Sequence, residues 1–158
     1  MATSLWSTLG LSAPLLAASV VTMLVGCVPT VNTIGGHTDA ELQQWAAEAQ
    51  VRCVRRTHRE PPYPFTTDGC TLSPDCTWQM CCVEHDMEYW CGGNATERAA
   101  ADTRLQSCVA AKGGGRTLAR LMYWAVRIAA HPLVPAYWRW GYGWSWLHGY
   151  SDETDQLK

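Results

Sequence analysis

The stretch WQMCCVEHDMEYWC, residues 78–91, decides the fold. No proline or glycine interrupts it and a Gly-Gly pair follows it, so the pattern predicts one continuous helix. Within it Cys81, His85 and Tyr89 recur every four residues and share one face, whereas Asp86 projects about 100° away from His85. Neighbouring polar side chains of this helix can therefore serve two different partners.

Three further helices are predicted around this one. Thr38 with Glu41, and Asn94 with Glu97, have the spacing of a capping box, which marks the start of a helix. Prolines make residues 60–77 a long loop. The expected helices cover residues 39–57, 94–112 and 116–130, the last with Leu118, Leu121, Met122, Ala125 and Ile128 on an apolar side opposite Arg116, Arg120 and Arg127. The chain is thus expected to be all-α, with a core helix pair, flanking helices and a long loop.

The first two core helices are expected to run antiparallel. In such a pair the residue numbers of contacting residues have a nearly constant sum, and His85–Asp102 and Cys81–Cys108 sum to 187 and 189. One geometry therefore permits both a disulfide and a His-carboxylate contact. A histidine can act as a general base toward water if a carboxylate holds its other ring nitrogen, and Asp102 is the candidate carboxylate.

Length and cysteine content predict one small, exported domain. The 158 residues suit a single domain, and eight cysteines favour disulfides and an oxidising compartment. Residues 1–38 carry no charged side chain, and Leu24-Val25-Gly26-Cys27 resembles a bacterial lipobox, whose cysteine is lipidated; a cleaved signal and a membrane anchor are the alternatives. We expect a leader at 1–27 ending at Cys27, a spacer at 28–37, a helical domain at 38–150 and an acidic tail at 151–158.

Charge and aromatic content indicate which partners to expect. A net charge of -2 gives no basic field that would attract nucleic acid. Between Asp102 and Asp152 there is no acidic residue, yet this segment contains Lys112, five arginines and several tryptophans. Cationic and indole groups favour a membrane interface, so contact with an anionic lipid surface is one hypothesis. The alternative is that the tryptophans fill the core.

A cation site is predicted beside the central helix. Asp86 faces away from His85, and with loop oxygens of the Asp68 region it could bind a hard cation, for which calcium is the natural choice. A disulfide between Cys70 and Cys82 would bring that loop beside Asp86. A competing interpretation groups four residues of the same helix as zinc ligands, namely Cys81, Cys82, His85 and Cys91.

Two motif blocks resemble the secreted phospholipase A2 superfamily. Cys-Cys-x-x-His-Asp-x-x-Tyr at 81–89 resembles the catalytic helix of the animal enzymes, and Asp-Gly-Cys-Thr-x-Ser-Pro-Asp at 68–75 followed by Cys-x-x-His-Asp resembles the bacterial and fungal enzymes. The resemblance covers roughly residues 66–108. It implies calcium at the Asp68 side chain, the Gly69 carbonyl and Asp86, with His85 as base, Tyr89 in support and, six residues before Cys108, Asp102 as the partner of His85.

The chain also departs from that family. The animal enzymes have a disulfide between the positions that are Glu88 and Ala101 in this chain, so both halves are missing together. Their glycine-rich calcium loop is absent, and Cys76 and Cys91 have no assigned counterpart.

The resemblance implies calcium-dependent hydrolysis of a phospholipid carboxylic ester by a water that His85 activates. The expected setting is the cell envelope, as a lipoprotein or an exported protein. Two alternatives are a catalytically silent relative that binds lipid or protein, and a structural envelope protein in which only the cysteines matter. A zinc module is the third.

Overall fold

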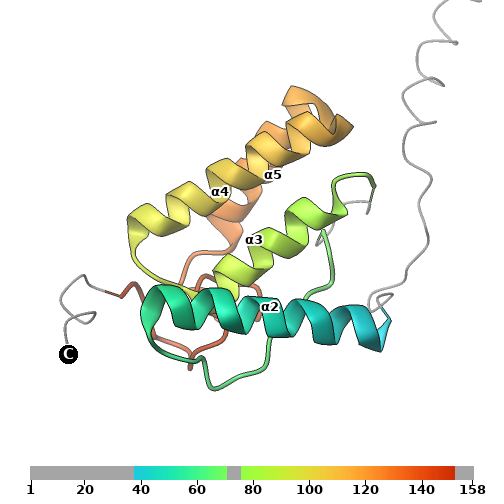
Figure 1. Cartoon of the computed structure of the whole chain (residues 1–158). Coiled ribbons are helices and arrows are strands. Elements are labelled where there is room, and N and C mark those ends of the chain that lie inside the picture. Colours follow the sequence, from blue (N-terminus) through green and yellow to red (C-terminus); the bar gives the residue numbers. More distant parts are fainter. Residues whose placement is uncertain (1–37, 71–75, 152–158) are drawn as a thin grey trace, which may run out of the picture.

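A computed structural model describes residues 38–70 and 76–151 and contains α2 (Asp39–Thr57), α3 (Gln79–Cys91), α4 (Ala95–Val109) and α5 (Gly115–Ala129), with a π-helical segment, η1, at Ala110–Gly114. In Figure 1, α3 lies between α2 on one side and α4 with α5 on the other. The described residues contain no strand. The predicted all-α, disulfide-linked fold is confirmed. No helix among these residues combines the length and the apolar composition that a membrane span needs.

Helix α2 begins and ends at the predicted residues. Thr38 and Glu41 form the predicted capping box. Trp45, Ala49 and Cys53 recur every four residues and are buried against α3, in a cluster with Val83 and Met87. A disulfide from Cys53 to Cys91 fastens α2 to the carboxyl end of α3, and it pairs two cysteines whose partners the sequence had left open.

Helices α3 and α4 form the predicted antiparallel pair. Their contacts are a Cys81–Cys108 disulfide, a His85–Asp102 hydrogen bond and a Tyr89–Arg98 hydrogen bond, which follow one another at one turn along α3 and at one to two turns along α4. The tail after α5 packs closely on the turn between them: a Cβ on Gly92, whose φ is 71°, would lie 2.9 Å from the Cα of Gly141 in that tail. Glycine is thus required where the chain reverses.

The junction of α4 and α5 differs from the prediction. The α-helix ends at Val109 rather than Lys112, and the chain continues through η1, where Gly113 has φ 101° and kinks the backbone. A Cβ on Gly114 would meet the Val109 side chain at 2.5 Å, so the glycines permit close packing as well as the bend. Helix α5 then folds back along α4 (Figure 1).

Only part of the predicted apolar side of α5 is buried. Ala119 is its only buried residue, and Leu118, Met122 and Val126 are partly buried beside it. Leu121 and Ile128, which belong to the predicted apolar side, are 64% and 74% exposed. Apolar residues occur on both sides of this helix, so periodicity alone could not identify the side that packs.

The tail after α5 caps the carboxyl end of α3. The Trp140 indole donates to Gly93 O and the Trp144 indole to Cys91 O, and the amide of Gly143 donates to Trp90 O. Trp140 is only 1% exposed. These two tryptophans therefore pack against the rest of the protein, which agrees with the alternative that the tryptophans fill the core. Of the predicted acidic tail only Ser151 is described, and the predicted leader, spacer and lipidated Cys27 lie outside the described residues.

Candidate active site

The centre of the site is a hydrogen bond between the core helices. His85 on α3 and Asp102 on α4 are both buried, and His85 Nε2 lies 2.9 Å from Asp102 Oδ1. When Nε2 carries the proton and donates it to Asp102, Nδ1 presents a lone pair. Nδ1 lies 4.0 Å from Asp86 Oδ1, too far for a hydrogen bond. This is the tautomer and orientation that a general base needs.

Asp102 is held by two further donors. The Tyr89 hydroxyl donates to Oδ1 at 2.7 Å, and Arg127 Nη1 donates to Oδ2 at 2.8 Å. Burial, and then the Asp102 charge, raise the pKa of Tyr89 far above its ordinary value, so the phenol remains a donor. Burial alone would raise the pKa of Asp102, but hydrogen bonds from His85, Arg127 and Tyr89 together lower it below its ordinary value. Asp102 is therefore a carboxylate at neutral pH.

Sequence reasoning missed two arginines of this network. Arg98, 1% exposed, donates from Nε to the Tyr89 hydroxyl and from Nη2 to Val126 O and Arg127 O at the end of α5. Its residue number and that of Tyr89 sum to 187, the same as for His85 and Asp102, so the helix register contained the signal. Nothing in the sequence indicated that Arg127 would turn inward to Asp102.

The predicted cation residues lie beside this network. The Cys70–Cys82 disulfide fastens the loop to the first turn of α3, one turn before Asp86. Thr67 Oγ1 donates to Asp86 Oδ2 at 2.6 Å and accepts the Gly69 amide at 3.1 Å. The predicted cation site required this disulfide, and the structure contains it.

Tyr142 lies within the electrostatic influence of Asp68 and Asp86. Its hydroxyl donates to Thr66 O at 2.6 Å. Burial, followed by the charges of Asp86 and Asp68, raises the pKa of Tyr142 well above its ordinary value. Two carboxylates therefore act on one phenol, which places their negative potential at one end of the loop.

The donors at this place suit calcium. The Asp68 carboxylate and the Gly69 carbonyl on the loop, with the Asp86 carboxylate on α3, are hard oxygen ligands of the kind that calcium accepts. No three His, Cys, Asp or Glu side chains group as a metal site in the described ranges, but the predicted calcium ligands include only two such side chains, Asp68 and Asp86. The zinc alternative is contradicted, because Cys81, Cys82 and Cys91 are all in disulfides and supply no thiolate.

No family model, curated protein or solved structure matches the chain. A function must therefore be argued from the residues of the site and from the two motif blocks.

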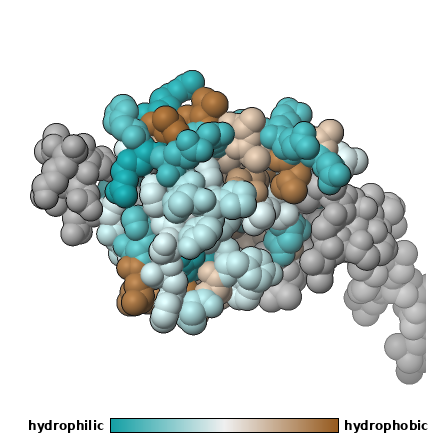
Figure 2. All heavy atoms as spheres, turned by 90° about the horizontal axis from the view of Figure 1, so that it is seen from below, coloured by the Kyte–Doolittle hydropathy of each residue, from teal (hydrophilic) through white to brown (hydrophobic). Residues whose placement is uncertain are grey.

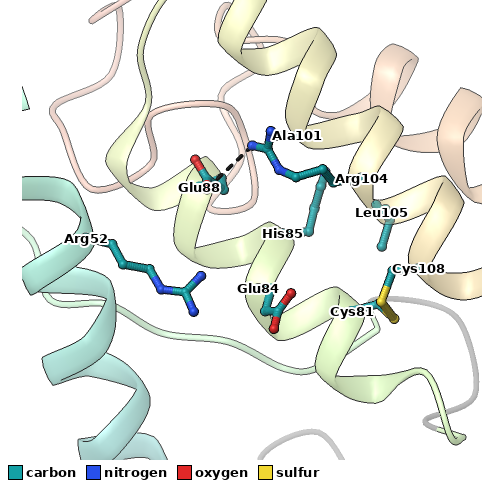
Figure 3. A pocket seen from close by; sticks show the side chains of 9 residues that line it. All are labelled: Arg52, Cys81, Glu84, His85, Glu88, Ala101, Arg104, Leu105 and Cys108. Atoms are coloured by element: carbon teal, nitrogen blue, oxygen red, sulfur yellow. Dashed lines mark ion pairs between the residues drawn. A yellow bond between two sulfur atoms is a disulfide. The ribbon is translucent and has the colours of Figure 1, made fainter. Parts of the chain in front are cut away.

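A cavity of about 190 Å³ reaches His85 from the side of α2 (Figure 3). Its wall includes Glu88 and Ala101, the positions at which the animal phospholipases have an extra disulfide. Charged side chains dominate the rim, with Arg104 paired to Glu88 at 3.5 Å. Such charged groups make the cavity unfavourable for an apolar chain, because apolar contact would take them out of water. The residues that line it are Arg52, Cys81, Glu84, His85, Glu88, Ala101, Arg104, Leu105 and Cys108.

Proposed function

We propose that this chain is a phospholipase A2-like hydrolase of phospholipid carboxylic esters that depends on calcium. The observation that carries the proposal is the His85–Asp102 hydrogen bond, which leaves His85 Nδ1 on the side of Asp86. Bound calcium would be held by Asp68, Gly69 and Asp86 and would polarise the ester carbonyl. The disulfides of the described residues support an exported protein, and its tethering through Cys27 remains part of the proposal.

The chain's own residues have separate tasks in this mechanism. His85 Nδ1 accepts a proton from water as that water attacks the ester carbon, and later returns it to the leaving alkoxide. Asp102 keeps the ring oriented and stabilises the imidazolium that forms. Tyr89 and Arg127 fix the carboxylate of Asp102 through one oxygen each. No covalent acyl-enzyme is needed, because the nucleophile is water.

The test of the proposal is a calcium titration of hydrolysis with the full-length, disulfide-bonded chain. Asp86→Asn keeps an oxygen but removes a charge, so we expect the calcium needed for half-maximal hydrolysis to rise at least about tenfold. Glu84→Gln is the matched control, because it removes an exposed charge from the same helix and should not change the titration. Hydrolysis that persists unchanged in excess chelator would contradict the calcium mechanism.

One contact favours a second candidate, a catalytically silent relative that binds lipid or protein. The Thr67 hydroxyl already occupies one oxygen of Asp86, and calcium would have to displace it or share that carboxylate. If this bond persists, calcium should neither bind nor support hydrolysis. Calcium binding measured by calorimetry, alongside the titration above, separates the two candidates.

Arg127 should act as a positioning residue. Arg127→Gln removes a hydrogen bond to a charged group, an effect of about 1.5 kcal/mol, so we expect kcat to fall about tenfold with little change in KM. The pKa of Asp102 should rise, which moves the acid limit of activity to higher pH. Arg127→Lys keeps the charge and should partly restore both kcat and the acid limit of activity. An unchanged pH profile in the glutamine variant would show that Arg127 only packs against the site.

A further inference from the structure

The outward side of α5 carries an unpartnered apolar row. Leu121, Trp124 and Ile128 follow one another at intervals of three and four residues, so they lie along one side of the helix. They are 64%, 58% and 74% exposed. The opposite side, centred on Ala119, packs against α4. Leu133, Tyr137 and Trp138, which are also exposed, follow in the next segment.

Cationic groups lie along one flank of this row. Arg116 and Arg120 are exposed, and Arg120 lies one turn before Trp124. Neither forms an ion pair within the described residues. No acidic residue occurs between Asp102 and Asp152 to balance them. The surface of α5 is therefore apolar along its centre and positive along its edge.

We propose that this outer face of α5 docks on an anionic lipid bilayer. A helix with a row of Leu, Trp and Ile beside arginines lies in the plane of a membrane interface, with its apolar row among the upper acyl groups and its cations at the phosphates. Trp124 suits this boundary because its ring is apolar and its N–H is polar. At 15 residues α5 is about 22 Å long, so it rests on the bilayer and does not span it.

Other occupants fit the surface less well. A second copy docked through the same face would offer Arg116 and Arg120 no acidic side chain, because α5 contains none. The side of the molecule on which α2 lies offers no comparable row: in Figure 2 its hydrophobic residues form separate spots among hydrophilic ones. The observations therefore single out α5 and an anionic, apolar partner.

Docking by α5 goes beyond ester hydrolysis, because it needs neither His85 nor calcium. Docking would nevertheless hold the His85–Asp102 site close to the bilayer, because Arg127 of the same helix donates a hydrogen bond to Asp102. The inward side of α5 thus contacts the catalytic network while its outward side contacts lipid.

The test is hydroxyl-radical footprinting of the full-length, disulfide-bonded chain on vesicles, with chelator present so that hydrolysis plays no part. One set of vesicles contains phosphatidylcholine alone and the other contains phosphatidylcholine with phosphatidylglycerol. We expect oxidation of Trp124 to slow severalfold on the anionic vesicles only. Tyr63, which is 52% exposed on the loop after α2, is the internal control and should oxidise at the same rate on both. Because any membrane attachment elsewhere in the chain acts on both residues, only local protection counts.

Charge variants make the test specific. Arg116→Gln with Arg120→Gln should abolish the protection of Trp124. The matched control, Arg52→Gln with Arg55→Gln, removes two exposed charges from α2 and should leave it intact. Equal protection on both kinds of vesicle, or none on either, would overturn the proposal. Protection that appears without vesicles as protein concentration rises would also overturn it, in favour of a second copy as the occupant.

Discussion

We expect His85→Gln to lower phospholipid hydrolysis by at least about 100-fold, the usual contribution of a general base, while leaving the fold intact. The glutamine amide can reach Asp102 as His85 Nε2 does, so the carboxylate keeps a donor. Its other terminal atom is an amide oxygen that accepts a proton far less readily than an imidazole. The measurement is the initial rate of fatty-acid release at saturating calcium, together with the thermal unfolding midpoint of the oxidised protein.

A matched histidine variant makes this result specific. His58, at the carboxyl cap of α2, has φ 55°, a conformation that asparagine tolerates. His58→Asn should therefore preserve both rate and stability. Full activity in His85→Gln would sink the proposed mechanism. A rate that falls together with the unfolding midpoint would assign His85 a structural role instead.

The core of the site could be predicted because helix geometry is regular. The resemblance implied Asp102 as the partner of His85, and the nearly constant sum of residue numbers in an antiparallel pair showed that one register permits this contact together with Cys81–Cys108. The Cys70–Cys82 disulfide was the condition for bringing the Asp68 loop beside Asp86. In each case two residues on regular elements, or in a matched motif, are enough to define the contact.

The contacts that escaped prediction depend on how α5 and the tail fold back. Arg127 and Leu121 lie on a helix with apolar residues on both sides, and only packing against α4 decides which side turns inward. Trp140 and Trp144 lie in a segment without regular period, and their indoles find carbonyls at the end of α3 that no sequence pattern marks. Long-range packing of irregular chain has no local signal.

Asp102→Ala should be the most destabilising single change in the described core. Its carboxylate is fully buried and accepts hydrogen bonds from His85, Tyr89 and Arg127. Alanine would leave three donors without an acceptor, one of them a guanidinium that is only 27% exposed. Breaking such a buried charged contact costs about 3–5 kcal/mol, which denaturant unfolding of the oxidised protein would measure. Glu84→Ala, an exposed carboxylate on α3, should change stability by less than about 0.5 kcal/mol.

The pH dependence of stability separates the charge of Asp102 from its packing. Because its pKa in the folded protein lies below that of the unfolded chain, the stability it contributes is fully present above about pH 4 and is lost as pH falls through the folded pKa. Asp102→Asn keeps the volume but has no charge to lose. The stability difference between wild type and Asp102→Asn should therefore be constant near neutral pH and shrink in acid. A difference that stays the same down to acid pH would mean that shape, and not the carboxylate charge, holds His85, Tyr89 and Arg127 together.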